Sequence, residues 1–171
     1  MSTGVALAHE LIAKRGSKPT DEYGTPDDLF TAISEVFGSF DMDGAAQEHN
    51  TKLPIWTNDA SMETWSGHIW LNPPYSMMPY FSGLAREYAR GTKTTDRLVA
   101  MLCRLDPSTR WWQNNVHRHA DVWMLSKRVR FIGADQSYNW PSALVIYNSP
   151  VWICHGHSCA YKYFQRWPNL S

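Results

Sequence analysis

The segment His68 to Tyr75, with the sequence HIWLNPPY, constrains the fold of this chain more than any other. Its first half is apolar, as in a buried strand, and it runs directly into Pro73 and Pro74. Because proline has no N–H to donate, consecutive prolines cannot continue a sheet ladder. A residue that precedes proline is also biased toward extended backbone, which makes the exit stiff. The sequence therefore predicts a buried strand over 68–72 that ends in a rigid turn.

Further strand-like segments alternate with segments of helical periodicity. We predict strands over 40–46, 53–60, 97–105, 121–132 and 142–148, and helices over 5–14, 26–37, 78–91 and 107–120. Thr25 is expected to cap the helix over 26–37, with Pro26 at its first position. The last two strands are joined by a Gly/Asp/Ser/Asn-rich loop and are expected to pair antiparallel. The alternation predicts an α/β fold, mostly parallel with one antiparallel C-terminal hairpin.

Length and composition favour a single domain. The chain has 171 residues, of which 43% are hydrophobic and 19% are charged, as in ordinary globular proteins. We predict an N-terminal extension (1–22), one domain (23–150) and an aromatic, basic tail (151–171) packed on it. The formal net charge is zero, so contact with nucleic acid requires a local basic patch. Without a secretory signal pattern or a membrane-spanning apolar run, a cytoplasmic location is expected.

Polar residues follow several predicted strands, and ligands of open α/β sheets bind beyond the carboxyl ends of strands. These residues are Asp41, Asp43, Asp59, Asn72, Arg104 and Asp106. Any one of them is explained as a turn or cap residue. Together with the double proline, they predict a binding site at one edge of the sheet.

The Asn-Pro-Pro-Tyr turn suits an amino group on a flat ring. The side-chain carbonyl of Asn72 and the main-chain carbonyl of Pro73 are two acceptors, and Tyr75 offers an aromatic face. Two acceptors on an exocyclic amine localise its lone pair and stabilise the positive charge that develops when it attacks. Each such hydrogen bond contributes about 1.5–3 kcal/mol.

With these features the chain resembles the phage-type Dam-like DNA adenine-N6 methyltransferases, which use S-adenosylmethionine. The resemblance covers residues 23–147 and rests on the ordered segments YGTPDDLF, FDMDGAAQEHN, WSGHIWLNPPY, LDPSTRWW, KRVRF and WPSALVIY. It implies an S-adenosylmethionine-dependent, Rossmann-like methyltransferase sheet over 23–150. It also implies methylation of the N6 amine of adenine in duplex DNA, with the adenine flipped out of the helix. Protection of phage DNA from host restriction, in the host cytoplasm, is the purpose that the resemblance suggests.

The resemblance also implies roles for individual residues. Asn72, Pro73, Pro74 and Tyr75 form the catalytic motif, in which Tyr75 stacks on the flipped adenine. The implied cofactor-binding residues are Thr25, Pro26, Asp41, Asp43, Ala45, Asp59 and Asn72. The loop after Asp43 departs from the family's glycine-rich pattern, because Gly44 is its one glycine.

The candidate substrate-binding residues are Tyr75, Arg104, Asp106, Lys127, Arg128, Arg130 and Phe131. The three basic residues after position 126 fit a solvated strand face as well as a phosphate contact. Phe131 fits the core, although the resemblance favours stacking on the base. Arg104 and Asp106 either pair with each other or bind substrate. The loops over 76–80 and 133–140 and the tail are candidates for base readout.

Several alternatives stay open. Cys154, His155, His157 and Cys159 are metal-ligand types, but their spacing is tighter than zinc sites use, so we predict no metal. A catalytically silent module that binds nucleic acid or a partner protein would keep the same cleft. A methyltransferase acting on RNA or on protein glutamine would keep the same motif.

Overall fold

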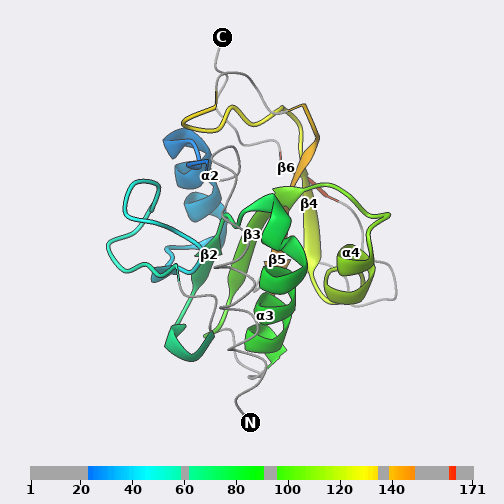
Figure 1. Cartoon of the computed structure of the whole chain (residues 1–171), viewed down its shortest axis with the longest axis horizontal. Coiled ribbons are helices and arrows are strands. Elements are labelled where there is room, and N and C mark those ends of the chain that lie inside the picture. The colour runs from blue at the N-terminus through cyan, green and yellow to red at the C-terminus, as the bar shows by residue number, and fades with distance from the viewer. Residues whose placement is uncertain (1–22, 59–61, 91–95, 135–138, 149–161, 165–171) are drawn as a thin grey trace.

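The computed structural model of the chain describes residues 23–58, 62–90, 96–134, 139–148 and 162–164 (Figure 1). Its helices are α2 (Asp27–Phe37), α3 (Met78–Arg90) and α4 (Arg110–Asn115), with the 3-10 turns η2 (Met62–Thr64) and η3 (Tyr75–Met77). Its strands are β1 (Met42–Asp43), β2 (Ile69–Leu71), β3 (Val99–Arg104), β4 (Asp121–Leu125), β5 (Ser142–Tyr147) and β6 (Lys162–Phe164). None of the described helices is long and apolar enough to cross a membrane.

The strands form one sheet in the order β1-β2-β3-β5-β4-β6. The β1–β2, β2–β3 and β4–β6 pairs are parallel, whereas β5 is antiparallel to both of its neighbours, β3 and β4. All strands except β5 therefore run in the same direction. The predicted α/β architecture with a mostly parallel sheet is confirmed. The predicted antiparallel partners β4 and β5 are neighbours, and β5 inserts between β3 and β4.

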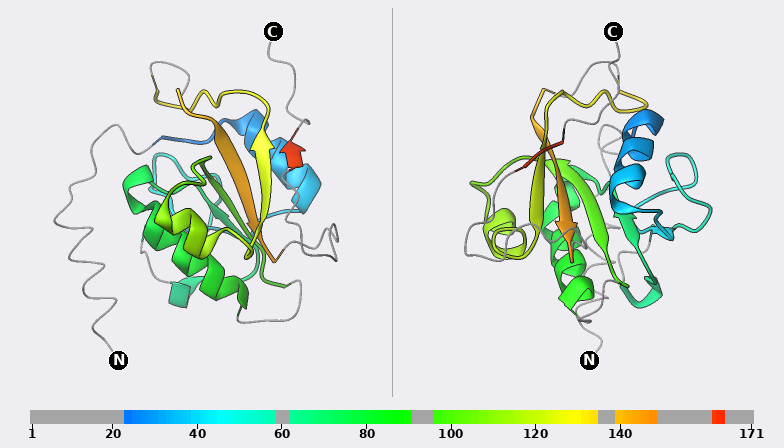
Figure 2. Two further views of the ribbon diagram at one scale, coloured as in Figure 1. Left: turned by 90° about the vertical axis from the view of Figure 1, so that its right-hand side faces the viewer. Right: turned by 180° about the vertical axis from the view of Figure 1, so that it is seen from behind.

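Helices cover both faces of the sheet (Figure 2). Alternate residues of β3 point to opposite sides: Val99, Met101 and Cys103 pack with α3 and α4, and Ala100 and Leu102 pack with α2. Because both faces are covered, β3 is apolar from Val99 to Cys103, as strands buried on both faces generally are. The core therefore has two layers, one on each side of the sheet.

Three strand predictions need correction. The strand expected over 40–46 is reduced to the two residues of β1, Met42–Asp43. Over 53–58, the described part of the segment 53–60, a single bridge between Asp43 and Trp56 replaces a strand. Pro54 has no N–H for a ladder at this point. The strand expected over 121–132 ends at Leu125, because the ladders of β4 with β5 and β6 end at Met124 and Leu125. Residues 126–131 continue as a connecting segment.

Two helix predictions also need correction. The helix expected over 107–120 is reduced to α4, Arg110–Asn115. Thr25 does not cap α2: Pro26 occupies the N-cap position, and no side chain caps the helix. Its first helical hydrogen bond runs from the Phe30 N–H to the Pro26 carbonyl at 3.0 Å. Proline supplies no capping side chain, so the Thr25 side chain is left for another role.

The tail contributes a strand that the sequence did not predict. Residues Lys162–Phe164 form β6, which pairs parallel with β4 in the register Trp123↔Lys162 to Leu125↔Phe164. The predicted helix over 5–14 and the four Cys and His residues of the tail lie outside the described residues.

Candidate active site

The carboxyl ends of β1, β2 and β3 meet at one edge of the sheet. Asp43 is the last residue of β1, Asn72 follows β2 directly, and Arg104 is the last residue of β3. The structure therefore brings these predicted site residues to the same edge. Asp41 lies at the other end of β1, where its carboxylate accepts the His68 N–H at 2.8 Å. This bond ties Asp41 to the turn before β2 and keeps it away from the edge that carries Asn72.

A shallow, narrow surface depression, open to solvent and too small to enclose a water molecule, lies at this edge and is called the pocket below. It is lined by Thr25, Asp43, Ala45, Ala46, Asn50, Trp70 and Asn72. Four of its lining residues are predicted cofactor-binding residues, namely Thr25, Asp43, Ala45 and Asn72. Segments distant in sequence thus form one concave surface.

Asp43 places a buried carboxylate in this pocket, since the residue is only 3% exposed. Its Oδ2 accepts the Lys52 N–H at 3.0 Å, and its Oδ1 accepts the Ala45 N–H at 3.5 Å. Burial raises the pKa of Asp43 to about 6, although these two N–H groups and the Lys52 charge lower it. The carboxylate would therefore gain from a cationic partner in the pocket.

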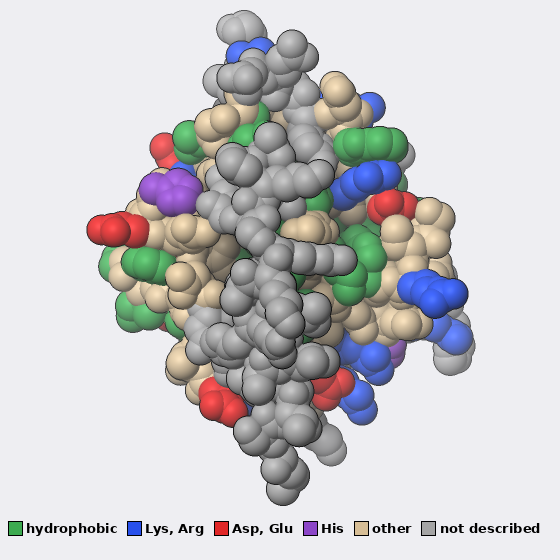
Figure 3. Space-filling view, viewed as in Figure 1, with side chains coloured by type: hydrophobic (Ala, Val, Ile, Leu, Met, Phe, Trp, Pro, Cys, Tyr) green, Lys and Arg blue, Asp and Glu red, His purple; other side chains and the backbone are tan. Residues whose placement is uncertain are grey.

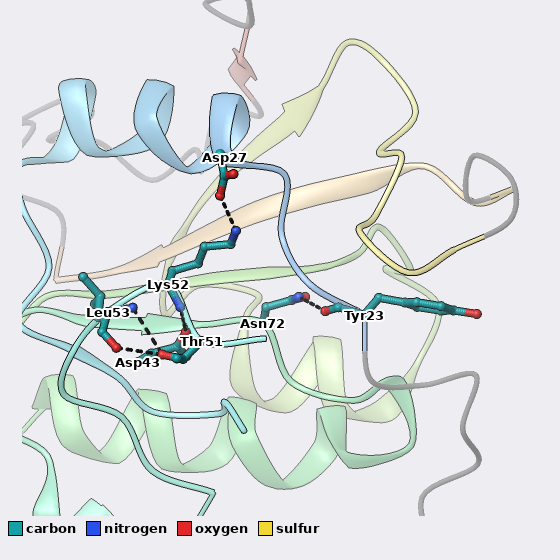
Figure 4. Close-up of polar contacts among 7 residues, drawn as sticks. All are labelled: Tyr23, Asp27, Asp43, Thr51, Lys52, Leu53 and Asn72. Atoms are coloured by element: carbon teal, nitrogen blue, oxygen red, sulfur yellow. Dashed lines mark hydrogen bonds and ion pairs between the residues drawn. The ribbon is translucent and has the colours of Figure 1, made fainter. Parts of the chain in front are cut away.

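Lys52 connects the pocket loop to α2. Its backbone N–H reaches Asp43, while its ammonium pairs with Asp27 at 2.5 Å in the first turn of that helix (Figure 4). The Lys52 side chain is 10% exposed and that of Asp27 is 86% exposed. The lysine charge is therefore directed outward to Asp27, and the loop is fixed against α2.

The side-chain amide of Asn72 is oriented by the main chain of Tyr23. Its Nδ2 donates to the Tyr23 carbonyl at 2.8 Å (Figure 4). A carbonyl oxygen accepts only from a donor, so this contact fixes which end of the amide is nitrogen. The Asn72 Oδ1 atom is the end of the amide that remains as an acceptor. Backbone hydrogen bonds between Gly24 and Ile132, at 3.1 and 2.8 Å, hold the Tyr23 segment in place.

The two prolines and Tyr75 form the rigid exit that the sequence predicts. Pro73 is buried, and Pro74 has extended backbone with φ −53° and ψ 139°. The Pro74 carbonyl accepts the Met77 N–H at 2.8 Å, which closes η3 immediately after the turn. Tyr75 is partly buried and packs on the core cluster that includes α3. The turn is therefore fixed at both of its ends.

Thr25 supplies a polar group that the fold itself does not use. The residue is 1% exposed, and its hydroxyl has no hydrogen-bond partner among the described residues. A buried unpaired hydroxyl costs about 1–3 kcal/mol. Because Thr25 lines the pocket, its hydroxyl lies where a bound ligand would reach it.

Arg104 and Asp106 form an ion pair at 3.2 Å, one of the two alternatives that the sequence left open. The Arg104 guanidinium also lies over the ring of Trp140, 3.6 Å from its centroid. Arg104 is the last residue of β3, Asp106 follows that strand, and Trp140 precedes β5, so all three lie at the carboxyl end of β3.

Comparison with known proteins decides the family. The model of the family "DNA N-6-adenine-methyltransferase (Dam)" matches residues 13–149. The chain belongs to this Dam family. It is similar to the DNA N-6-adenine-methyltransferase of Haemophilus phage HP1 (strain HP1c1), with 31% identity over 152 residues that cover 80% of this chain and 85% of the phage protein.

A second Dam-family relative is the DNA N-6-adenine-methyltransferase of Escherichia phage T1. Its identity to this chain is 29% over 107 residues, which cover 60% of this chain and 43% of the phage protein. The resemblance inferred from the ordered motifs is thus confirmed at the level of the family.

Other predicted residues of this Dam-family chain lie outside the pocket. Phe131 is 3% exposed, and its ring stacks on Tyr23 with centroids 6.1 Å apart. Lys127, Arg128 and Arg130 are exposed on the segment after β4. Asp59 lies outside the described residues.

Sequence reasoning missed two residues that line the pocket, Asn50 and Trp70, and the Tyr23 carbonyl that orients Asn72. Asn50 ends the segment FDMDGAAQEHN, but its side chain accepts the Gln47 N–H at 2.7 Å, as an ordinary turn residue does. A tryptophan in an apolar strand such as Trp70 is normally predicted to be a core residue. The position of a main-chain carbonyl cannot be predicted from residue types. Only the fold brings them next to Asn72.

Charged side chains on the face of the Dam-family chain shown in Figure 3 are mixed in sign. Lys and Arg side chains lie mainly on the right half of this view, with Asp and Glu side chains among them.

Of the described residues, no group of three or more His, Cys, Asp or Glu could hold a metal ion.

Proposed function

We propose that this chain transfers a methyl group from S-adenosylmethionine to the N6 amine of adenine in DNA, on a Rossmann-like methyltransferase sheet. The observation that carries this proposal is the position of Asn72. Its amide is oriented by Tyr23 and lines the same pocket as the buried carboxylate of Asp43. A cation-binding group and an amine-binding group thus share one small concave surface.

The residues present fit the cofactor. The Asp43 carboxylate suits the amino group of the methionine part, and the Thr25 hydroxyl, buried without a partner among the described residues, offers a further hydrogen bond. Ala45 and Ala46 line the pocket with small side chains, so a ligand can approach the backbone there. When bound, S-adenosylmethionine supplies an electrophilic methyl group. Pro26 and Asn72 complete the proposed cofactor-binding set.

The adenine would be held by the turn after β2. The Asn72 Oδ1 atom and the Pro73 carbonyl accept hydrogen bonds from the target amine, Pro74 stiffens the turn, and Tyr75 stacks on the ring. Methyl transfer requires no general base of shifted pKa, so the residues of the turn act by orienting the amine and stabilising the charge that develops on it. An adenine inside a duplex cannot reach this turn, so the base must be flipped out.

Contacts to the DNA backbone would come from the segment after β4. Lys127, Arg128 and Arg130 are exposed there, and the Arg128 guanidinium fixes the segment by donating to the Asn139 carbonyl at 2.6 Å. A protein with zero net charge needs such a local cluster to hold a polyanion.

Methyl transfer from tritiated S-adenosylmethionine to unmethylated duplex DNA, followed by nucleoside digestion, tests the proposal. We expect label in N6-methyladenine, and loss of about 10²-fold or more in kcat for Asn72→Ala. Asn114→Ala, an exposed residue on α4, is the matched control. Absence of label in the DNA would contradict the proposed substrate, and near-normal turnover of Asn72→Ala would contradict the mechanism.

A further inference from the structure

Trp140 is the most exposed of the tryptophans that the structure describes, at 48%. Trp65, Trp70 and Trp112 are 6%, 0% and 1% exposed, so the fold has other places for indole rings. Trp140 stands just before β5, beyond the carboxyl end of β3. It therefore lies at the edge of the sheet that carries Asn72 and Asp43.

The indole is held in place. The Arg104 guanidinium lies 3.6 Å from its ring centroid, and Asp106 fixes the guanidinium through the 3.2 Å ion pair. The backbone on either side is also fixed: Asn139 accepts from Arg128 at 2.6 Å, and Pro141 accepts the Leu105 N–H at 2.9 Å. A side chain anchored in this way has already lost most of the entropy that binding would otherwise remove.

One face of the ring is covered and the other is available. Because the guanidinium occupies one face, most of the exposed 48% of Trp140 must belong to the opposite face and the ring edges. An exposed, immobilised indole face beside a cation is a surface on which a flat, electron-rich ring stacks. Bases are such rings, and stacking accepts any of them because every base has a π face.

We propose that Trp140 is a stacking platform for a base of the DNA substrate other than the target adenine, with Arg104 and Asp106 as positioning residues. The inference rests on the proposed function, because it takes DNA as the ligand. It differs from the expectation that Arg104 and Asp106 bind substrate themselves. In this arrangement Arg104 and Asp106 pair with each other, and the Arg104 guanidinium holds the indole ring of Trp140.

The experiment separates stacking from charge. Anisotropy binding is measured with a labelled oligo(dT) strand and with an abasic strand of the same length, which has the same phosphates and no bases. Trp140→Ala should weaken binding of oligo(dT) by about 5- to 150-fold and leave binding of the abasic strand unchanged. Trp140→Phe should keep most of the wild-type affinity for oligo(dT). Arg104→Met should lose part of the affinity for oligo(dT), and its unfolding midpoint should shift no more than that of Trp140→Ala.

Lys127→Ala is the control, because loss of a phosphate contact weakens both strands equally. Equal weakening of both strands by Trp140→Ala, or no weakening of either, would overturn the platform. If the wild-type protein methylates DNA and Trp140→Ala still binds oligo(dT) in preference to the abasic strand, this inference alone is disproved. A wild-type protein that neither methylates DNA nor binds either strand would disprove the proposed function as well.

Discussion

The Asn72 side-chain amide donates to the Tyr23 main-chain carbonyl at 2.8 Å across 49 residues of sequence. This bond joins the turn after β2 to the segment that leads into Thr25 and α2. This hydrogen bond therefore couples the side chain proposed to hold the adenine amine to the segment proposed to hold the cofactor. A change at either partner should be felt at both.

Asn72→Asp should uncouple the two segments. The variant keeps an acceptor oxygen but replaces the donor with a second oxygen, which would face the Tyr23 carbonyl. Loss of this bond with two acceptors left opposed should lower the free energy of unfolding by about 1–3 kcal/mol, measured in urea. Asn114→Asp adds the same charge at an exposed site on α4 and should have little effect. Equal stability of Asn72→Asp and wild type would show that the bond does not hold the segment.

The stability of the protein should fall between pH 3.8 and about 6 because of Asp43. Burial raises its pKa from 3.8 to about 6, so the folded state binds the proton more tightly than the unfolded state. The contribution is therefore fully present below pH 3.8 and is lost as pH rises through 6, a change of about 3 kcal/mol. Asp43→Asn should remove this decline, as urea titrations at both ends of the window would reveal. An unchanged decline in the variant would assign it to another group.

Affinity for S-adenosylmethionine should have the opposite pH dependence. A carboxylate binds the cationic amino group, and the protonated acid does not, so affinity should weaken by up to about tenfold per pH unit below the Asp43 pKa. Calorimetric titration over this range measures it. Asp43→Asn should bind more weakly and with a flat profile. A wild-type profile that is also flat would argue that Asp43 does not contact the ligand.

Gly44→Ala should destabilise the fold through packing. A Cβ at this position would lie 3.0 Å from side-chain atoms of Ile69, Leu71 and Trp65, all of them buried. Overpacking of this kind costs about 1–3 kcal/mol. Gly83→Ala is the control, because a Cβ there meets only Asn115 at 3.8 Å and alanine favours helix α3. Thermal unfolding should rank Gly83→Ala above wild type and Gly44→Ala below it.

Salt dependence should reveal the phosphate contacts. Each of Lys127→Ala and Arg130→Ala should reduce the slope of log affinity for DNA against log salt by about 1. Arg90→Ala removes a charge at the last residue of α3, where it pairs with Glu87 at 3.4 Å, and should leave the slope unchanged. If all three variants share the wild-type slope, the segment after β4 does not contact the DNA backbone.

Local patterns predicted much of the fold. The apolar run over 97–105 became β3, and the double proline ended β2 immediately after Leu71. Ladder length was harder to predict, because a strand continues only while a neighbour offers hydrogen bonds. The strand predicted over 121–132 is therefore longer than β4, whose ladders with β5 and β6 end at Met124 and Leu125.

The sequence by itself determined the family, the alternation of strands and helices, and the turn at Asn72, because these follow from local chemistry and from the order of motifs. Only the tertiary structure distinguished Asp43 from Asp41. The two carboxylates are only two residues apart in the sequence, yet the pocket lies at one end of β1 and the His68 turn at the other. Contacts such as Tyr23 to Asn72 and Arg104 to Trp140 likewise required the fold, since residues so far apart in sequence meet only when the sheet brings its strand ends together.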